Sequence, residues 1–154
     1  MPVSFCAEAD RRVILWAAIL ASSMGFIDSS VTSIALPAMR EALGASLPQA
    51  QWINASYLLA VSSLVLVGGA MGDRFGIARI FSLGILVFVA GSLACAAALT
   101  PDQMIAARAA KGVGAAMMVP GSMAMISRAY PREERGRALG LWAAASTLTT
   151  ALGP

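Results

Sequence analysis

The sequence predicts an all-α membrane protein with about four full transmembrane helices and a truncated fifth. Of its 154 residues, 58% are hydrophobic and only 12% are charged, whereas about 25% are charged in an average soluble domain. The mean hydropathy is +0.76. Five apolar runs meet or approach the roughly 20 residues that a helix needs to cross a hydrocarbon layer of about 30 Å. These features argue against an ordinary soluble domain.

We divide the chain into a cytoplasmic N-terminal leader and a partial N-terminal transmembrane half, at residues 1–12 and 13–154. The five helices are expected at about 13–37, 51–71, 80–99, 103–126 and 138–154. The first run also has the form of a signal peptide, because Arg11 and Arg12 precede it. We favour a retained span, since the run continues past a plausible cleavage point and four more follow.

Capping residues mark several helix starts. Thr100-Pro101-Asp102-Gln103 has the order of an N-cap, a first-turn proline and a glutamine at N3, and Ser46-Leu47-Pro48-Gln49 is similar. Pro131 is expected to open a short helical stretch before the fifth span. Residues 68–81 are expected to form a tight turn between the second and third spans. Such short connections predict antiparallel neighbouring helices.

The arginines predict the orientation in the membrane. One side has only Arg40, and the other side has eight arginines: Arg11, Arg12, Arg74, Arg79, Arg128, Arg132, Arg135 and Arg137. Since positive charges concentrate on the cytoplasmic side, the N-terminus is expected in the cytoplasm of a multi-pass protein of the cell membrane.

Three ionisable residues lie inside the apolar runs, where each costs about 2.5–3.5 kcal/mol on insertion scales. Asp28 shares a helix face with Thr32, and is expected to be a proton-titrating carboxylate or the contact for a cationic substrate. The alternative is a hydrated carboxylate near the outer interface. Arg108 is expected to pair with an acid of another helix, although both Arg108 and Lys111 also suit basic anchors at the membrane surface.

Further candidates flank these charges. Asn54 and Tyr57 are three residues apart and are expected to face one cavity, unless Asn54 simply lies near the interface. Gly112 and Gly114 predict close approach of the fourth helix to a neighbour, and Pro120 predicts a kink.

Several functional classes are disfavoured. The chain has no histidine, and its two cysteines, Cys6 and Cys95, lie far apart, so neither a metal site nor a cofactor is predicted. No nucleophile and base are paired, which argues against an enzyme. The bases form no stripe with interleaved aromatic residues, which argues against nucleic-acid binding.

Two stretches of the sequence resemble signatures of the major facilitator superfamily. "GAMGDRFGIAR" resembles its loop between helices 2 and 3, here called the latch motif, and "RAAKGVGAAMMVPG" looks like its helix 4 signature. The latch motif matches at Gly69, Asp73, Arg74 and Gly76, with Arg79 as a further base, and departs at Met71, Gly72, Ile77 and Ala78. The helix 4 matches are Arg108, Gly112, Gly114 and Pro120.

Three others resemble the fourteen-span drug/proton antiporters of that superfamily. "FIDSSVTSIALPAM" is similar to their helix 1 signature, with Ser30 and Ser33 in place of the usual threonine and asparagine, and "WINASYLL" is similar to their helix 2. The terminal "TALGP" resembles the opening of their helix 5 signature at Gly153 and Pro154.

The resemblance implies a proton-coupled exporter of drugs or amphipathic compounds. By that resemblance Asp28 takes part in proton coupling and Arg108 tunes a proton site, while Asp73 and Arg74 lock the cytoplasmic side. Gly153 and Pro154 seal helix packing and favour antiport. The implied partners are the lipid bilayer, protons, a small amphipathic or cationic substrate, and a missing C-terminal half of the same transporter.

Because such transporters have twelve or fourteen spans, the chain is expected to be an N-terminal fragment that is inactive by itself. Two alternatives stay open. One is a superfamily member that carries a metabolite such as a sugar or an organic acid. The other is a non-transporting, truncated membrane remnant.

Overall fold

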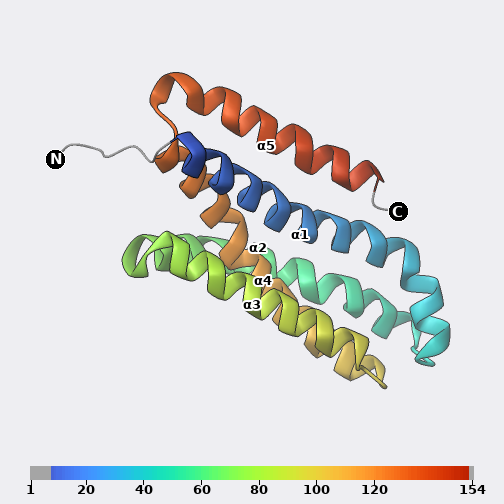
Figure 1. The fold of residues 1–154 in the computed structure, drawn as a ribbon. Coiled ribbons are helices and arrows are strands. Elements are labelled where there is room, and N and C mark those ends of the chain that lie inside the picture. Colours follow the sequence, from blue (N-terminus) through green and yellow to red (C-terminus); the bar gives the residue numbers. More distant parts are fainter. Residues whose placement is uncertain (1–7, 153–154) are drawn as a thin grey trace.

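The computed structural model describes residues 8–152 and folds them into α-helices (Figure 1). The helices are α1 (Glu8–Ala42), α2 (Leu47–Phe75), α3 (Ile77–Ala96), α4 (Pro101–Ala129) and α5 (Arg132–Leu152). Within this described part, α1 to α4 are long and apolar enough to cross a membrane. The predicted all-α membrane fold is therefore confirmed. Gly153 and Pro154 lie outside the described residues.

The helices differ from the apolar runs in their bounds. α1, α2 and α4 extend into polar sequence at both ends, because hydropathy marks the lipid-embedded part of a helix and not its last hydrogen bond. α3 ends at Ala96, earlier than expected, and a short turn then leads to the cap of α4. The short helix expected after Pro131 and the fifth span form one continuous helix.

The predicted caps are present. The Ser46 side chain accepts a hydrogen bond from the backbone N–H of Gln49, whose side chain accepts one from the Ser46 N–H, so the capping box is complete. The Thr100 hydroxyl likewise accepts from the N–H of Gln103 at 3.3 Å. Here the glutamine side chain accepts from the backbone of Leu99, one residue before the cap.

The tight turn expected within residues 68–81 is present, but it is much shorter than the expected helix bounds of 71 and 80 implied. Helix α2 continues to Phe75 and α3 begins at Ile77, so Gly76 alone separates them. Gly76 has a φ of 101°, a region that residues with a Cβ rarely adopt. A single glycine therefore reverses the chain, and most of the latch motif is helical.

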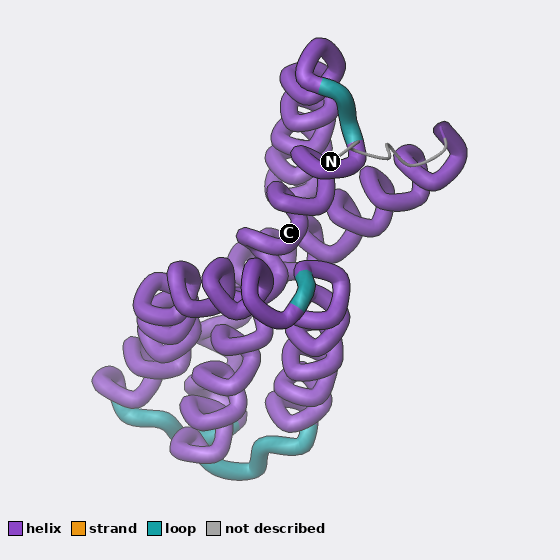
Figure 2. The backbone as a smooth tube through the Cα atoms, turned by 90° about the vertical axis from the view of Figure 1, so that its left-hand side faces the viewer, coloured by secondary structure: helices purple, strands orange, loops and turns teal. Residues whose placement is uncertain are grey.

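Helix α4 lies at the centre of the bundle and packs against each of the other helices. Figure 1 shows α5 running beside α1, away from α3, and Figure 2 shows the short connections between helices. Small residues permit the closest approaches. A Cβ on Gly114 would lie 2.5 Å from the backbone nitrogen of Phe88, and one on Gly112 would lie 2.7 Å from the carbonyl of Tyr57. The close packing predicted for Gly112 and Gly114 is thus confirmed.

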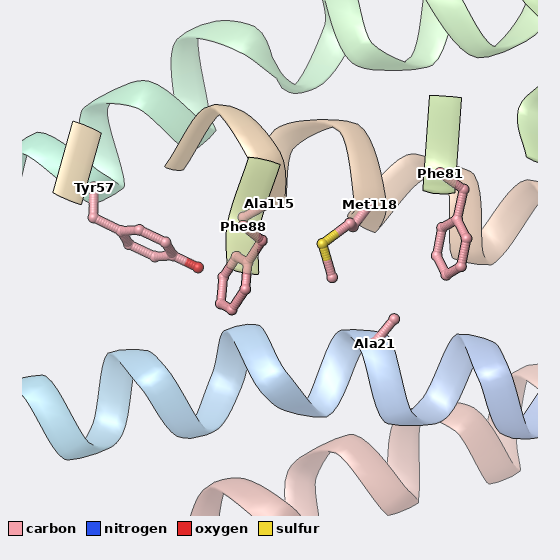
Figure 3. Close-up of a cluster of buried hydrophobic side chains, with 6 residues drawn as sticks. All are labelled: Ala21, Tyr57, Phe81, Phe88, Ala115 and Met118. Carbon is pink, nitrogen blue, oxygen red and sulfur yellow. The ribbon is translucent and has the colours of Figure 1, made fainter. Parts of the chain in front are cut away.

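Two apolar clusters hold these helices together. The first combines side chains of α1, α2, α3 and α4 (Figure 3): Ala21, Tyr57, Phe81, Phe88, Ala115 and Met118. The second lies where α5 meets α1 and α4, and contains Leu15, Ala18, Ile19, Ile126 and Ala138. Many other large apolar side chains, such as Leu66 and Leu86, are exposed, as expected for surfaces that face lipid.

Candidate functional site

Asp28 of α1 lies between two cations of α4, and we call Asp28, Arg108 and Lys111 the charge cluster. Its Oδ2 is 2.6 Å from Nη1 of Arg108, and its Oδ1 is 2.5 Å from Nζ of Lys111. The side chains are only 14%, 3% and 9% exposed, respectively. The acid that Arg108 was predicted to meet on another helix is therefore Asp28. Lys111 also binds it, so neither base acts as a surface anchor here.

Aromatic rings and one backbone carbonyl complete the surroundings of the two bases. Arg108 donates from Nε to the carbonyl of Ile53 at 3.1 Å, and its guanidinium lies 4.6 Å from the ring centroid of Tyr57. Nζ of Lys111 lies 4.8 Å from the ring centroid of Phe88. Both are cation–π distances. Nη2 of Arg108 is buried and has no hydrogen-bond partner among the described residues.

Local sequence places these groups. Arg108 and Lys111 are three residues apart, so they project from one side of α4 toward α1. Close backbone approach brings the neighbouring helices around them. A Cβ on Gly91 would lie 2.9 Å from the Cα of Lys111, so α3 can pack here only with glycine. A glycine of α3 thus allows that helix to pack closely on α4 beside the cluster, which lies on α1 and α4.

The structure separates the other predicted site residues. Tyr57 contacts the cluster through Arg108, whereas Asn54 is partly exposed and its side chain makes no hydrogen bond or ion pair within residues 8–152. Thr32 follows Asp28 by one helical turn and is buried. The sequence did not indicate Ile53 or Phe88 as contacts, since one acts through its backbone and the other through its ring face.

An apolar pocket of about 190 Å³ adjoins the charge cluster between α1, α2 and α4. Tyr57 lines the pocket and contacts Arg108 of the cluster, and Ser29, the neighbour of Asp28, also lines the pocket. Most of its other walls are apolar, including Val61 and Met118. The arrangement therefore places a small apolar space next to two buried bases and a partly buried carboxylate.

Hydroxyl groups link α5 to α1 and α4, a feature that hydropathy did not reveal. Nε1 of Trp142 donates to Oγ of Ser22 at 3.0 Å, and Oγ of Ser22 donates to Ser122 at 3.3 Å. Oγ1 of Thr149 donates to Ser23 at 3.2 Å. The hydrogen bonds of α5 thus reach α1, and Ser22 continues the link to α4, beside the second apolar cluster.

The latch motif carries an exposed ion pair. Oδ1 of Asp73 is 3.2 Å from Nη2 of Arg128 near the end of α4, and both side chains are more than 60% exposed. Arg74 lies over the ring of Phe75 at 5.5 Å. A Cβ on Gly69 would lie 3.6 Å from Cβ of Pro120, and both residues line a pocket of about 170 Å³ together with Asp73. Arg79 is exposed, and α4 continues beyond Pro120 to Ala129.

Ionisable residues buried within membrane-length helices often mark ion or substrate pathways. The sequence profile of the Major Facilitator Superfamily matches residues 18–154, and the chain belongs to this superfamily. Members of the superfamily are transporters.

Two curated relatives have names that refer to drug resistance. The chain is 40% identical over 132 residues to the methylenomycin A resistance protein of Bacillus subtilis, covering 85% of this chain and 28% of that protein. It is 36% identical over 146 residues to the putative multidrug resistance protein MdtD of Klebsiella pneumoniae, covering 95% of this chain and 31% of that protein. The chain thus spans less than a third of these relatives.

A solved structure supports the fold. The chain superimposes with a TM-score of 0.83 on a bacterial homolog of the human lysosomal transporter Spinster, crystallised in an inward-facing and occupied conformation. The match covers 96% of this chain and 32% of that one at 22% sequence identity. At this identity the likeness concerns the fold.

Proposed function

We propose that this chain is the N-terminal portion of a proton-coupled exporter of drugs or other amphipathic compounds. The observation that carries the proposal is Asp28, which lies within a membrane-length helix and is held by Arg108 and Lys111 of another. Buried ionisable residues of this kind mark ion and substrate pathways. The names of the two relatives, which refer to drug resistance, favour export.

The proposed coupling works through helix packing. Both carboxylate oxygens of Asp28 bind cations of α4. A proton on Asp28 would remove the negative charge that holds these two bases, and would weaken the contact between α1 and α4. Proton binding would thereby shift the balance between two arrangements of these helices, as alternating access requires.

The proposed substrate path adjoins this contact. The apolar pocket beside Tyr57 would accept part of an amphipathic compound, since ligand sites are mostly apolar with a few oriented polar groups.

In this proposal the latch motif, through Asp73, stabilises one conformation at the cytoplasmic ends of the helices. The eight arginines at those ends support a protein of the cell membrane whose N-terminus lies in the cytoplasm.

We also propose that the 154 residues do not transport by themselves. Transporters of this architecture move one helical half against the other around a central site, and the chain corresponds to less than a third of its relatives. Residues beyond this stretch would supply the second half, including the partner surface for the latch motif and for Gly153 and Pro154.

Efflux from proteoliposomes tests the proposal. A longer protein that continues this sequence should expel an amphipathic dye when a pH gradient is imposed, and the 154-residue chain should not. Asp28→Asn should lower gradient-driven efflux at least about tenfold, and Asp102→Asn, at an exposed helix start, should not. Efflux at a rate that does not depend on the pH gradient would rule out proton coupling. Robust efflux by the 154-residue chain would contradict its proposed inactivity.

A further inference from the structure

We infer that the charge cluster binds the anionic group of the exported compound, so that the substrate class is an organic acid with an apolar body. This inference rests on the proposed export function and names its substrate. It differs from the expectation of a cationic substrate at Asp28, because Arg108 and Lys111 already bind that carboxylate.

The first argument is the balance of buried charge. The cluster contains two bases and one carboxylate, and therefore carries one excess positive charge. The other seven acids of the chain lie in terminal turns of helices: Glu8, Asp10, Glu41, Asp73, Asp102, Glu133 and Glu134. Within the described residues, no acid other than Asp28 pairs with Arg108 or Lys111. Because an unpaired buried charge is costly, the cluster favours a second anion.

The second argument is the unused donor of Arg108. Its Nη1 binds Asp28 and its Nε binds the Ile53 carbonyl, while the buried Nη2 has no partner among residues 8–152. A guanidinium presents its N–H groups as a planar fork that matches a carboxylate. Arg108 therefore has a hydrogen-bond donor available for a second acidic group, on a side chain that is only 3% exposed.

The third argument is the adjoining pocket. Tyr57 contacts the guanidinium of Arg108 and also lines the apolar pocket of about 190 Å³. A ligand could place its apolar body in this pocket and its carboxylate at the cluster. The apolar part would then contact apolar side chains, and the carboxylate would contact the bases. A cation in the same place would meet Arg108 and Lys111, which have the same charge and already occupy both oxygens of Asp28.

Calorimetry of the 154-residue chain in lipid nanodiscs tests the inference, with empty nanodiscs subtracted. Three probes share one naphthalene body: 2-naphthoate, 2-naphthalenemethanol and 2-naphthylmethylammonium. We expect 2-naphthoate to bind with a Kd about tenfold below that of the alcohol, as a charge-assisted hydrogen bond allows. The ammonium compound should bind most weakly.

Variants separate the cluster from general surface charge. Lys111→Gln removes the excess positive charge and should reduce the preference for 2-naphthoate over the alcohol to about twofold or less. Lys111→Arg should retain the preference. Arg137→Gln, at an exposed position of α5, changes the net charge equally and should leave it unchanged. Circular dichroism establishes that each variant keeps its helices.

Three results would overturn the inference: tighter binding of the ammonium compound, no measurable binding of 2-naphthoate, or an unchanged preference in a folded Lys111→Gln variant. Binding is measured without a proton gradient, so its outcome is independent of transport. Selective carboxylate binding without gradient-driven efflux by the longer protein would contradict only the proposed function. Gradient-driven efflux without carboxylate binding would contradict only this inference.

Discussion

Arg108 and Asp28 are 80 residues apart in the sequence, and they meet at 2.6 Å across the interface between α1 and α4. Arg108 also binds the carbonyl of Ile53 in α2. One side chain thereby connects three helices within the apolar part of the bundle. The same contact underlies the proposed coupling and the packing of α1, so its loss is expected to affect stability as well as function.

Removing Asp28 should destabilise the bundle. Asp28→Asn leaves two buried bases without their counter-ion, and breaking one partner of a buried pair typically costs about 3–5 kcal/mol. The measurement is the free energy of unfolding in mixed micelles. The double variant Asp28→Asn with Lys111→Met should recover part of the loss, because it removes one uncompensated base. If the single variant is as stable as the natural chain, the cluster does not hold α1 to α4.

Adding a methyl group at Gly114 should disrupt the contact of α4 with α3. The new Cβ would lie 2.5 Å from the Phe88 backbone nitrogen and 2.7 Å from the Gly84 carbonyl. Such overpacking costs about 1–3 kcal/mol or more, measured as a lower thermal midpoint of Gly114→Ala. Gly136→Ala is the matched control, because nothing lies within 4 Å of its added Cβ. Equal midpoints for both variants would contradict the close approach.

Asp73→Asn should separate transport from stability. The Asp73–Arg128 pair is largely exposed, and exposed pairs contribute about 0–1 kcal/mol, so membrane insertion and unfolding should change little. In a longer protein that continues this sequence, gradient-driven efflux should fall at least about fivefold if the latch motif controls conformation. Unchanged efflux would reduce the motif to a determinant of orientation.

Trp142→Phe should loosen α5. The change keeps an aromatic ring but removes the hydrogen bond from Nε1 to Ser22, which is worth about 0.5–1.5 kcal/mol, and part of the indole that packs against the second apolar cluster. Faster amide hydrogen exchange in α5, with α2 and α3 unaffected, is the expected result. Trp16→Phe is the control, since Trp16 is 59% exposed. If amide exchange in α5 is equally fast in the two variants, the hydroxyl contacts do not position α5.

Some of the candidate site was accessible from the sequence. A charged residue in an apolar helix must find a partner, so Asp28 and Arg108 could be expected to meet an opposite charge. Lys111 remained ambiguous, because a long basic side chain can reach either a buried acid or the membrane surface. The roles of Ile53 and Phe88 were inaccessible, since a backbone carbonyl and a ring face leave no distinctive mark in residue type.

The sequence by itself determined the all-α membrane fold, the caps at Ser46 and Thr100, and the presence of charges that lipid does not tolerate alone. These follow from local chemistry, because helix length, capping and hydropathy depend on residues a few positions apart. Only the tertiary structure decided that Lys111 joins Arg108 on Asp28, that Nη2 of Arg108 lacks a partner, and that Gly76 alone separates α2 from α3. The two features at the cluster depend on how close the helices come, which the glycines of α3 and α4 set through contacts between residues distant in sequence.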